Sequence, residues 1–247
     1  MHTFWYDLLT STNDMALERA RELDNLSIIA AFCQSAGRGQ AGNKWSSREG
    51  ENLLFSILLK DFRCFGLDPL PAGDQFLLSR AAALAVVTFL EKWDLQAAIK
   101  WPNDIYVGDR KIAGILIENA LRGQTLVRCI VGVGLNLGQR EFPPELPNPT
   151  SVSLLSGCLF TKEDLPGELE RFAAIFESLL QRSTADIGAE YERRLYRRME
   201  WHPYRDMRSG KIFEARLLGT DRGGLARLED RSGAIRKYAF KELAFII

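Results

Sequence analysis

The stretch from residue 100 to 118, KWPNDIYVGDRKIAGILIE, constrains the fold of this chain more than any other. Two apolar runs, IYV and IAGILIE, flank Gly108-Asp109, a pattern that is typical of a β-hairpin closed by a two-residue turn. Lys111 stands at the head of the second run, where its ammonium is costly to bury without a partner. The sequence therefore predicts either a lysine that reaches solvent, or a lysine that awaits an anion which the chain itself does not supply.

The surrounding pattern predicts a larger α and β assembly around this hairpin. Strands are predicted by apolar runs at residues 3–9, 26–33, 53–60 and 126–137. Helices are predicted after STND at 11–14, and over about 75–93, 162–182 and 185–199. Asp74 is expected to cap the second helix, while Thr161 and Asp164 resemble a capping box for the third. With a further turn at 122–124, the strands around residue 110 predict an antiparallel meander.

The last fifty residues have a different character. The short β-like runs KIFEARLLG, GGLARLED and IRKYAF are separated by glycines, which predicts a small all-β module. We place the boundary near residue 200.

Composition narrows the function classes. The 247 residues include 32 Lys and Arg and 32 Asp and Glu, so no global field favours nucleic acid or an anionic membrane. The four cysteines (Cys33, Cys64, Cys129 and Cys158) form no C-x-x-C motif, which argues against zinc and favours a reduced compartment. The N-terminus lacks the pattern of a signal peptide, and the apolar run at 81–90 is too short to span a bilayer.

Residues 34–52, QSAGRGQAGNKWSSREGEN, show no periodicity and are predicted to form a long loop. Its glycines allow backbone N–H groups to converge on an anion. Arg38 adds a planar guanidinium that can bind phosphate or carboxylate through two hydrogen bonds. Trp45 offers a flat apolar face to a ring system. The loop lacks the Walker A pattern. The alternative is a solvated, mobile loop without function.

Three further groups of residues carry candidate chemistry. At the hairpin, Asp104 is an oxygen donor suited to Mg²⁺, Lys111 is a point charge for an anion, and Gly114 admits a ligand to the backbone. The alternative for this group is a turn with exposed charges.

Ser11-Thr12-Asn13 predicts either a helix cap or groups aimed at a neutral polar ligand. The glycines of 132–136, GVGLN, predict either close packing or a nucleotide against the strand, and both interpretations stay open.

Together, these motifs resemble the catalytic domain of bacterial biotin protein ligases, also called biotin–[acetyl-CoA-carboxylase] ligases. The resemblance rests on STN at 11, QSAGRGQAGNKW at 34, KWPNDIYVGDRKIAGILIE at 100 and GVGLNL at 132, and it covers most of residues 5–140. It implies an α+β fold over residues 1–199, with a mixed, largely antiparallel central sheet flanked by helices. For residues 200–247 it implies an SH3-like β module.

The resemblance also implies a two-step reaction. Biotin and ATP form biotinyl-5′-AMP, and a lysine of a biotin carrier domain then attacks this anhydride. Lys111 and Arg38 are the implied catalytic residues. The implied biotin site comprises Ser11, Thr12, Asn13, Gln34, Gly37, Arg38, Gly39, Trp45, Lys111 and Gly114. The implied nucleotide site comprises Gln40, Asn43, Lys44, Trp45, Lys100, Asn103, Gly114, Gly134 and Asn136, with Asp104 as the candidate Mg²⁺ ligand.

One departure from the family pattern concerns the loop. Many relatives have G-R-G-R-x-G there, whereas this chain has Gln40 in place of the second arginine and Asn43 at the next basic position. This predicts weaker retention of the adenylate.

The resemblance implies a carboxylase carrier domain as partner and a cytoplasmic location, with the protein a monomer or homodimer. Many relatives carry an N-terminal DNA-binding domain, but this chain begins at the catalytic strand, so we expect the ligase-only class, without DNA or membrane partners.

Three other functions compete with this interpretation. A lipoate or octanoate ligase would share the lysine strand, but such families usually have a different, R-R-x-S-G-G-G-type loop. A catalytically silent biotin sensor would be expected to lack Lys111 or Arg38, and both are present. The last alternative is an α/β domain that binds an unknown small ligand.

Overall fold

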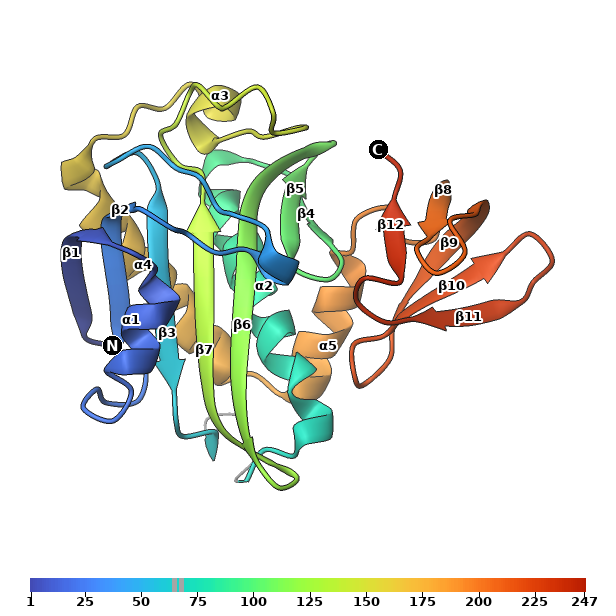
Figure 1. Ribbon diagram of the computed structural model, residues 1–247, viewed down its shortest axis with the longest axis horizontal. Coiled ribbons are helices and arrows are strands. Elements are labelled where there is room, and N and C mark those ends of the chain that lie inside the picture. Colours follow the sequence, from blue (N-terminus) through green and yellow to red (C-terminus); the bar gives the residue numbers. More distant parts are fainter. Residues whose placement is uncertain (64–65, 67–68) are drawn as a thin grey trace.

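The computed structural model describes residues 1–63, 66 and 69–247, so Cys64 lies outside the described residues. Its strands form two sheets (Figure 1). The larger sheet has seven strands in the order β1-β2-β3-β7-β6-β5-β4. These are β1 (Thr3–Leu9), β2 (Ile28–Gln34), β3 (Leu53–Leu59), β4 (Ala97–Lys100), β5 (Asp104–Val107), β6 (Arg110–Arg122) and β7 (Thr125–Leu135). Among the described strand pairs of this sheet only β1–β2 is parallel, which confirms a mixed, largely antiparallel sheet.

The central hairpin forms where the sequence predicts it. Val107 pairs with Arg110, and Gly108 between them has φ +56°, a conformation that glycine adopts without a Cβ penalty. Gly123, with φ +60°, closes the next turn. The antiparallel meander β4-β5-β6-β7 is therefore confirmed.

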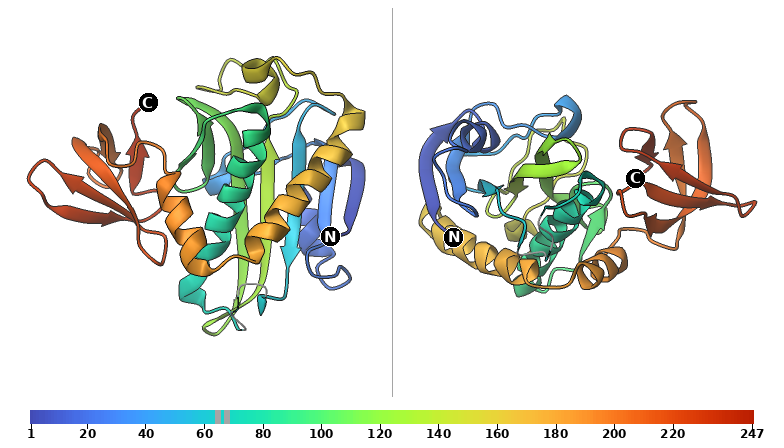
Figure 2. Two further views of the ribbon diagram at one scale, coloured as in Figure 1. Left: turned by 180° about the vertical axis from the view of Figure 1, so that it is seen from behind. Right: turned by 90° about the horizontal axis from the view of Figure 1, so that it is seen from below.

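Helices cover both faces of this sheet. The described helices are α1 (Thr12–Glu18), α2 (Phe76–Leu90), α3 (Val152–Ser156), α4 (Leu165–Leu180) and α5 (Thr184–Arg193), of which α3 lies at one end of the sheet (Figure 1). Figure 2 shows α2 and α4 crossing one face, whereas α1 lies on the opposite face against β2, β3 and β7. By length and composition the helical segment Ala72–Trp93 could span a membrane, but 61% of its apolar window is buried within the protein. It therefore serves here as the core helix.

Two predicted caps are confirmed and one is wrong. Ser11 Oγ accepts a hydrogen bond from Asp14 N at 3.4 Å, and Thr161 and Asp164 form the capping box ahead of α4. Asp74 does not cap α2, because Gln75 occupies that position without a side-chain bond. Instead the Asp74 carboxylate binds Arg222 of the C-terminal module, with Oδ2 2.6 Å from Nη2. A two-point bond to a guanidinium is stronger than a single bond to a backbone N–H.

The smaller sheet consists of C-terminal strands, all antiparallel, in the order β11-β10-β9-β8-β12. They are β8 (Trp201–Asp206), β9 (Ile212–Thr220), β10 (Ala226–Asp230), β11 (Ile235–Tyr238) and β12 (Leu243–Phe245). This is consistent with the SH3-like module that the resemblance implies. The division at 199/200 remains our prediction.

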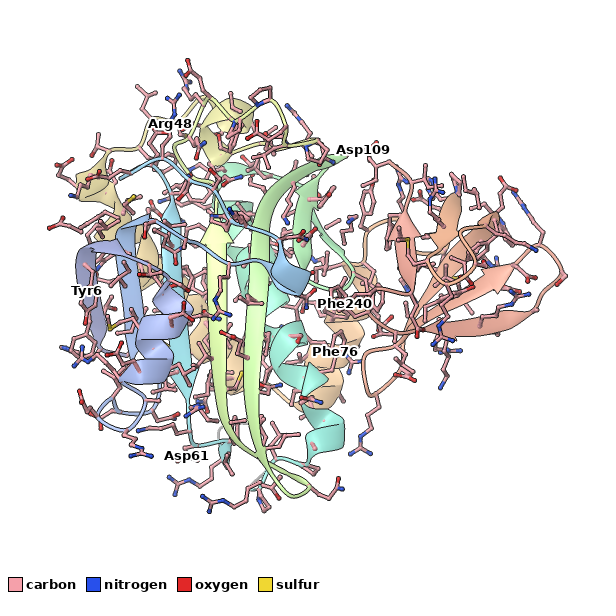
Figure 3. All side chains as sticks on the ribbon, in the orientation of Figure 1. Tyr6, Arg48, Asp61, Phe76, Asp109 and Phe240 are labelled. Carbon is pink, nitrogen blue, oxygen red and sulfur yellow. The ribbon has the colours of Figure 1, made fainter. Side chains whose placement is uncertain are left out.

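The C-terminal module packs against the larger sheet. Trp101 Nε1 donates to Gly224 O at 2.9 Å, and Phe76 packs so closely on Gly224 that a Cβ there would overlap its ring. Phe76 and Phe240 both lie at this boundary in Figure 3. Buried residues of the module, such as Leu217, belong to the same apolar core as α2. The boundary is therefore closely packed, and it forms one side of the cavity described next.

Candidate active site

A cavity of about 310 Å³ lies at the larger sheet; we call it the first cavity. Five parts of the chain line it: the start of α1, the end of β2 at Gln34, the loop at 38–45, the meander from the end of β4 to β7, and residues 240, 241 and 243–245 of the module. Sixteen of the predicted site residues line it: Ser11, Thr12, Asn13, Gln34, Arg38, Gly39, Gln40, Asn43, Lys44, Trp45, Lys100, Asn103, Asp104, Lys111, Gly114 and Gly134. The tertiary fold thus gathers segments that are more than 200 residues apart in the sequence.

One end of the first cavity is a fixed polar network under α1. Thr12 N donates to Gln34 Oε1 at 2.7 Å. The hydroxyl of Ser56 lies 2.7 Å from Thr12 Oγ1 and 2.6 Å from Asn13 Oδ1. Since the Asn13 oxygen can only accept, the single Ser56 proton goes to it and the Thr12 hydroxyl donates to Ser56. These hydroxyl and amide groups are buried and held in place, as recognition of a neutral polar ring requires.

Arg38 is held by two carboxylates beside this network. Its Nη2 lies 2.6 Å from Asp14 Oδ1 and 2.9 Å from Glu118 Oε2. Glu118 Oε2 also accepts from Asn13 Nδ2 at 2.7 Å. One acidic side chain therefore positions both the loop arginine and the amide of α1.

Two glycines on neighbouring strands form a flat surface for Trp45. Gly114 and Gly134 are register partners in β6 and β7. A Cβ on Gly114 would lie 3.0 Å from Trp45 Cζ3, and a Cβ on Gly134 would overlap the indole. Gly132 is the next glycine on this face of β7, and a Cβ there would overlap the side chain of Asn13. These glycines therefore allow close side-chain packing, and a nucleotide beside Gly134 remains a prediction.

Lys111 has an anionic partner within the chain, which corrects the expectation that the chain supplies none. Its Nζ lies 2.6 Å from Asp104 Oδ1, across the hairpin. Lys100 Nζ lies 3.7 Å from the other carboxylate oxygen. The Lys111 side chain remains 33% exposed, so it is still accessible to a ligand.

Lys100 is the more deeply buried of these two lysines. Its Nζ stands 5.0 Å from the ring centroid of Tyr106 and 5.3 Å from that of Phe245. Burial lowers the pKa of Lys100, the nearby Asp104 carboxylate opposes this, and the Lys111 ammonium adds to the lowering. A bound anion would stabilise its charged form.

A second cavity, of about 710 Å³, adjoins the first. Its wall includes Asn136 and the proline-rich segment from Phe142 to Pro149. Five residues line both cavities: Asn43, Lys44, Trp45, Asp104 and Lys111. The two cavities thus meet at the Lys111–Asp104 pair.

The structure places two predicted residues outside the first cavity. Asn136 lines only the second, and its Nδ2 donates to Thr150 O at 2.9 Å. Gly37 packs against the Trp45 carbonyl and Gln34 and is not among the described residues that line either cavity. Asn103, which lines the first cavity, also braces β6, since its Nδ2 donates to Ile115 O at 2.7 Å.

Sequence reasoning missed several residues of this site. Ser56 is fully buried, and its signal was a single hydroxyl within the apolar run LLFSILL. Glu118 had a similarly weak signal, since it is a single acidic residue at the end of the apolar run ILIE. Residues 240, 241 and 243–245, which line the first cavity, gave no local signal, because only packing of the module brings them there.

The donor set around Asp104 does not fit a magnesium ion held by the protein. Among the described residues that line the first cavity, Asp104 is the only carboxylate, and two ammonium groups already flank it. The described residues also contain no group of three or more His, Cys, Asp or Glu placed to hold a metal. The cavity is instead suited to anions.

Comparison with known proteins agrees with this geometry. Residues 5–136 match the family described as Biotin/lipoate A/B protein ligase. The chain is 30% identical over 246 residues to the bifunctional ligase/repressor BirA of Bacillus subtilis, covering 96% of this chain and 72% of that protein. It is 31% identical over 133 residues to the biotin–[acetyl-CoA-carboxylase] ligase of Paracoccus denitrificans, covering 51% of each.

A solved structure of biotin protein ligase from Aquifex aeolicus, in complex with biotin and ATP, superposes with a TM-score of 0.75. The identity is 25%, and the match covers 99% of this chain and 98% of that one. The chain belongs to the biotin/lipoate A/B protein ligase family.

Proposed function

We propose that this protein is an ATP-dependent ligase that activates biotin to biotinyl-5′-AMP and transfers it to a lysine of a biotin carrier domain. The observation that carries the proposal is the junction of two cavities at Lys111 and Asp104. A reaction that joins two acids needs each held in its own pocket with the reacting groups meeting at a cation. The named biotin ligases among the relatives support the same activity.

The first cavity is suited to biotin. Its neutral polar end, lined by Ser11, Thr12 and Gln34, offers donors and acceptors to a ureido ring. Trp45, which packs on the glycine surface, supplies apolar contact for the rest of the molecule. A ligand that lies along this cavity would bring its carboxylate to Lys111.

The second cavity is suited to the adenosine of ATP. Trp45 Nε1 and Asn136 Oδ1 are both buried and, within the described part of the chain, have no hydrogen-bond partner. Buried polar groups are normally paired, so these two atoms favour a polar ligand. The apolar segment from Phe142 to Pro149 would cover its ring.

The chemistry then follows from the positions of the charges. A biotin carboxylate oxygen attacks the α-phosphorus, a new P–O bond forms, and the bond to the β-phosphate breaks as pyrophosphate leaves with the electron pair. Lys111 stabilises negative charge at the α-phosphate, and at about 4 Å and an effective dielectric near 20 such a pair is worth roughly 4 kcal/mol. Arg38, the other predicted catalytic residue, is held by Asp14 and Glu118 at the biotin end.

In the second step the neutral amine of the carrier lysine attacks the biotinyl carbonyl carbon. A C–N bond forms, the C–O bond to AMP breaks, and the amine releases its proton to solvent. The partner that this step requires is a protein that presents a lysine amine, and we propose a carboxylase carrier domain for this role, in keeping with the name of the Paracoccus denitrificans relative. A monomeric or homodimeric state, a cytoplasmic location and the absence of DNA and membrane partners remain predictions.

Magnesium also remains a prediction. Because Asp104 is flanked by two lysines, we propose that any magnesium ion is held chiefly by the phosphates of ATP, and no step above depends on it.

The main alternative substrate is lipoate, which the family name includes. The polar end formed by Ser11, Thr12 and Gln34 favours biotin, because lipoate has no ureido group to pair with these atoms. ATP–pyrophosphate exchange measured separately with biotin and with lipoate tests this choice. We expect exchange with biotin alone, and exchange with lipoate alone would refute the proposal.

A further inference from the structure

The C-terminal module forms one side of the first cavity through the turn at residues 239–242 and the strand β12. Phe240 and Lys241 of this turn line the cavity, as does Phe245 of β12. Lys100 lies at the same end, since its Nζ is 5.3 Å from the Phe245 ring centroid. Lys100 and Lys241 therefore bring two positive charges to this end of the cavity.

The backbone of Lys241 is unusual for a lysine. Glu242 N donates to Ala239 O at 3.0 Å and closes the turn, and Lys241 within it has φ +73°. Glycine adopts this left-handed region freely, whereas a residue with a Cβ pays roughly 1–2 kcal/mol. Residues in this region persist where the surrounding structure holds them in place, and they are frequent at ligand-binding sites.

Lys241 also lacks an acidic partner in the described part of the chain; its Nζ lies 6.0 Å from the centroid of the Phe240 ring, at the limit of a cation–π contact. Within residues 1–63, 66 and 69–247 no carboxylate lies within ion-pair distance of its Nζ, whereas Arg38 and Lys111 both have carboxylate partners. Gln40 of the loop lines the same cavity and is neutral. The buried Oε1 of Gln40 has no hydrogen-bond partner among the described residues. The Lys241 ammonium is thus available to an anionic ligand.

We propose that Lys241 binds the β- and γ-phosphates of the nucleotide and thereby supplies, from the C-terminal module, the positive charge that the loop lacks at Gln40. The inference rests on the proposed function, because it assigns the triphosphate to the module end of the first cavity. Lys100 and Lys241 would contact the part of ATP that leaves as pyrophosphate, and Lys111 would contact the α-phosphate.

The test compares Lys241→Gly with wild type in biotin-dependent ATP–pyrophosphate exchange. Glycine removes the charge and relieves the strained φ, so the variant should melt at the same or a higher temperature. We expect the KM for ATP to rise about tenfold, which corresponds to the loss of one charge contact, with the KM for biotin unchanged. Binding of AMP, which lacks the two terminal phosphates, should also be unchanged.

Two further variants control this experiment. Lys211→Gly removes an exposed lysine of the same module that does not line the cavity, and it should leave the KM for ATP unchanged. Lys241→Gln keeps most of the side-chain length without the charge and should behave as Lys241→Gly does. A KM for ATP within twofold of wild type in both Lys241 variants would overturn the inference.

The double variant Gln40→Arg/Lys241→Gly tests the relation between the two residues. An arginine on the loop should restore most of the lost ATP affinity, since both positions line one cavity. Absence of rescue would overturn the assignment of a shared role. If wild type itself shows no biotin-dependent exchange, it is the proposed function that fails, so the two failures are distinguishable.

Discussion

Lys111 Nζ lies 2.6 Å from Asp104 Oδ1, across the two strands of the hairpin β5-β6. The pair stands where the two cavities meet, and Asp104 also lies 3.7 Å from Lys100 Nζ. The carboxylate therefore holds the Lys111 ammonium at the junction before any substrate arrives. Such preorganisation is what makes a charge effective in the transition state, because little reorganisation is needed when the reaction occurs.

The glycine surface should not tolerate side chains. In Gly132→Ala the new Cβ would overlap the amide of Asn13, and Gly132 cannot move away because β7 is paired on both sides. We expect roughly 1–3 kcal/mol lower stability from overpacking and at least about a tenfold higher KM for biotin. Thermal unfolding and exchange kinetics measure the two effects.

A matched control for this substitution is Gly167→Ala in α4, where a Cβ would meet open space. It should leave the kinetics unchanged and raise stability by roughly 0.5–1 kcal/mol, as expected for glycine replaced within a helix. If both variants had equal KM values for biotin, the displaced Asn13 would have no part in binding.

Alkaline pH should reduce activity through Lys100. Burial lowers the pKa of this lysine, so it loses its proton at a lower pH than an ordinary lysine and the charge available to phosphate disappears as the pH rises. We expect kcat/KM for ATP to fall at a lower pH than the titration of an ordinary lysine would give, and Lys100→Arg to shift the fall to higher pH because arginine stays protonated. If kcat/KM for ATP fell at the same alkaline pH in Lys100→Arg as in wild type, the titrating group would not be Lys100.

Adding a cation to the loop should slow the loss of the intermediate. Gln40 lines the first cavity, and its Oε1 has no partner among the described residues. In Gln40→Arg the new guanidinium would attract the adenylate phosphate, and we expect its release to be several-fold slower. The measurement is release of labelled biotinyl-AMP from preloaded enzyme; a rate equal to that of wild type would refute the prediction.

The loop over the cavity should become resistant to proteolysis when substrates bind. Residues 37–45 are closed by backbone bonds such as Gly39 N to Asn43 O at 2.7 Å, and several of their side chains line the cavity. We predict that biotin with ATP slows cleavage within residues 37–50, since the ligand would hold the loop closed and shield the anhydride from water. Cleavage at the same rate with and without both substrates would contradict this.

Local chemistry explains which features the sequence could predict. The Gly108-Asp109 turn, the Ser11 cap and the Thr161/Asp164 box depend on neighbouring residues, and all three are confirmed. The predicted Asp74 cap is wrong because Arg222, distant in the sequence, binds the same carboxylate. Lys111 acquired a partner for the same kind of reason, since only the strand register brings Asp104 to it.

The residues that sequence reasoning missed depend on tertiary packing. Ser56 matters because α1 places Thr12 and Asn13 against it, and Lys241 reaches the cavity only because the C-terminal module packs on the larger sheet. A single buried hydroxyl or an exposed lysine carries no local pattern that distinguishes it from ordinary structural residues.

The central claim is that Lys111 supports formation of the anhydride between biotin and AMP. Biotin-dependent ATP–pyrophosphate exchange by wild type and by Lys111→Ala, at matched folded concentrations, tests it most directly. We predict that the variant loses about 100- to 1000-fold in rate, the range expected when a charge-stabilising group at the reacting centre is removed. Exchange within a few-fold of wild type in Lys111→Ala would contradict the account and remove this lysine from the mechanism.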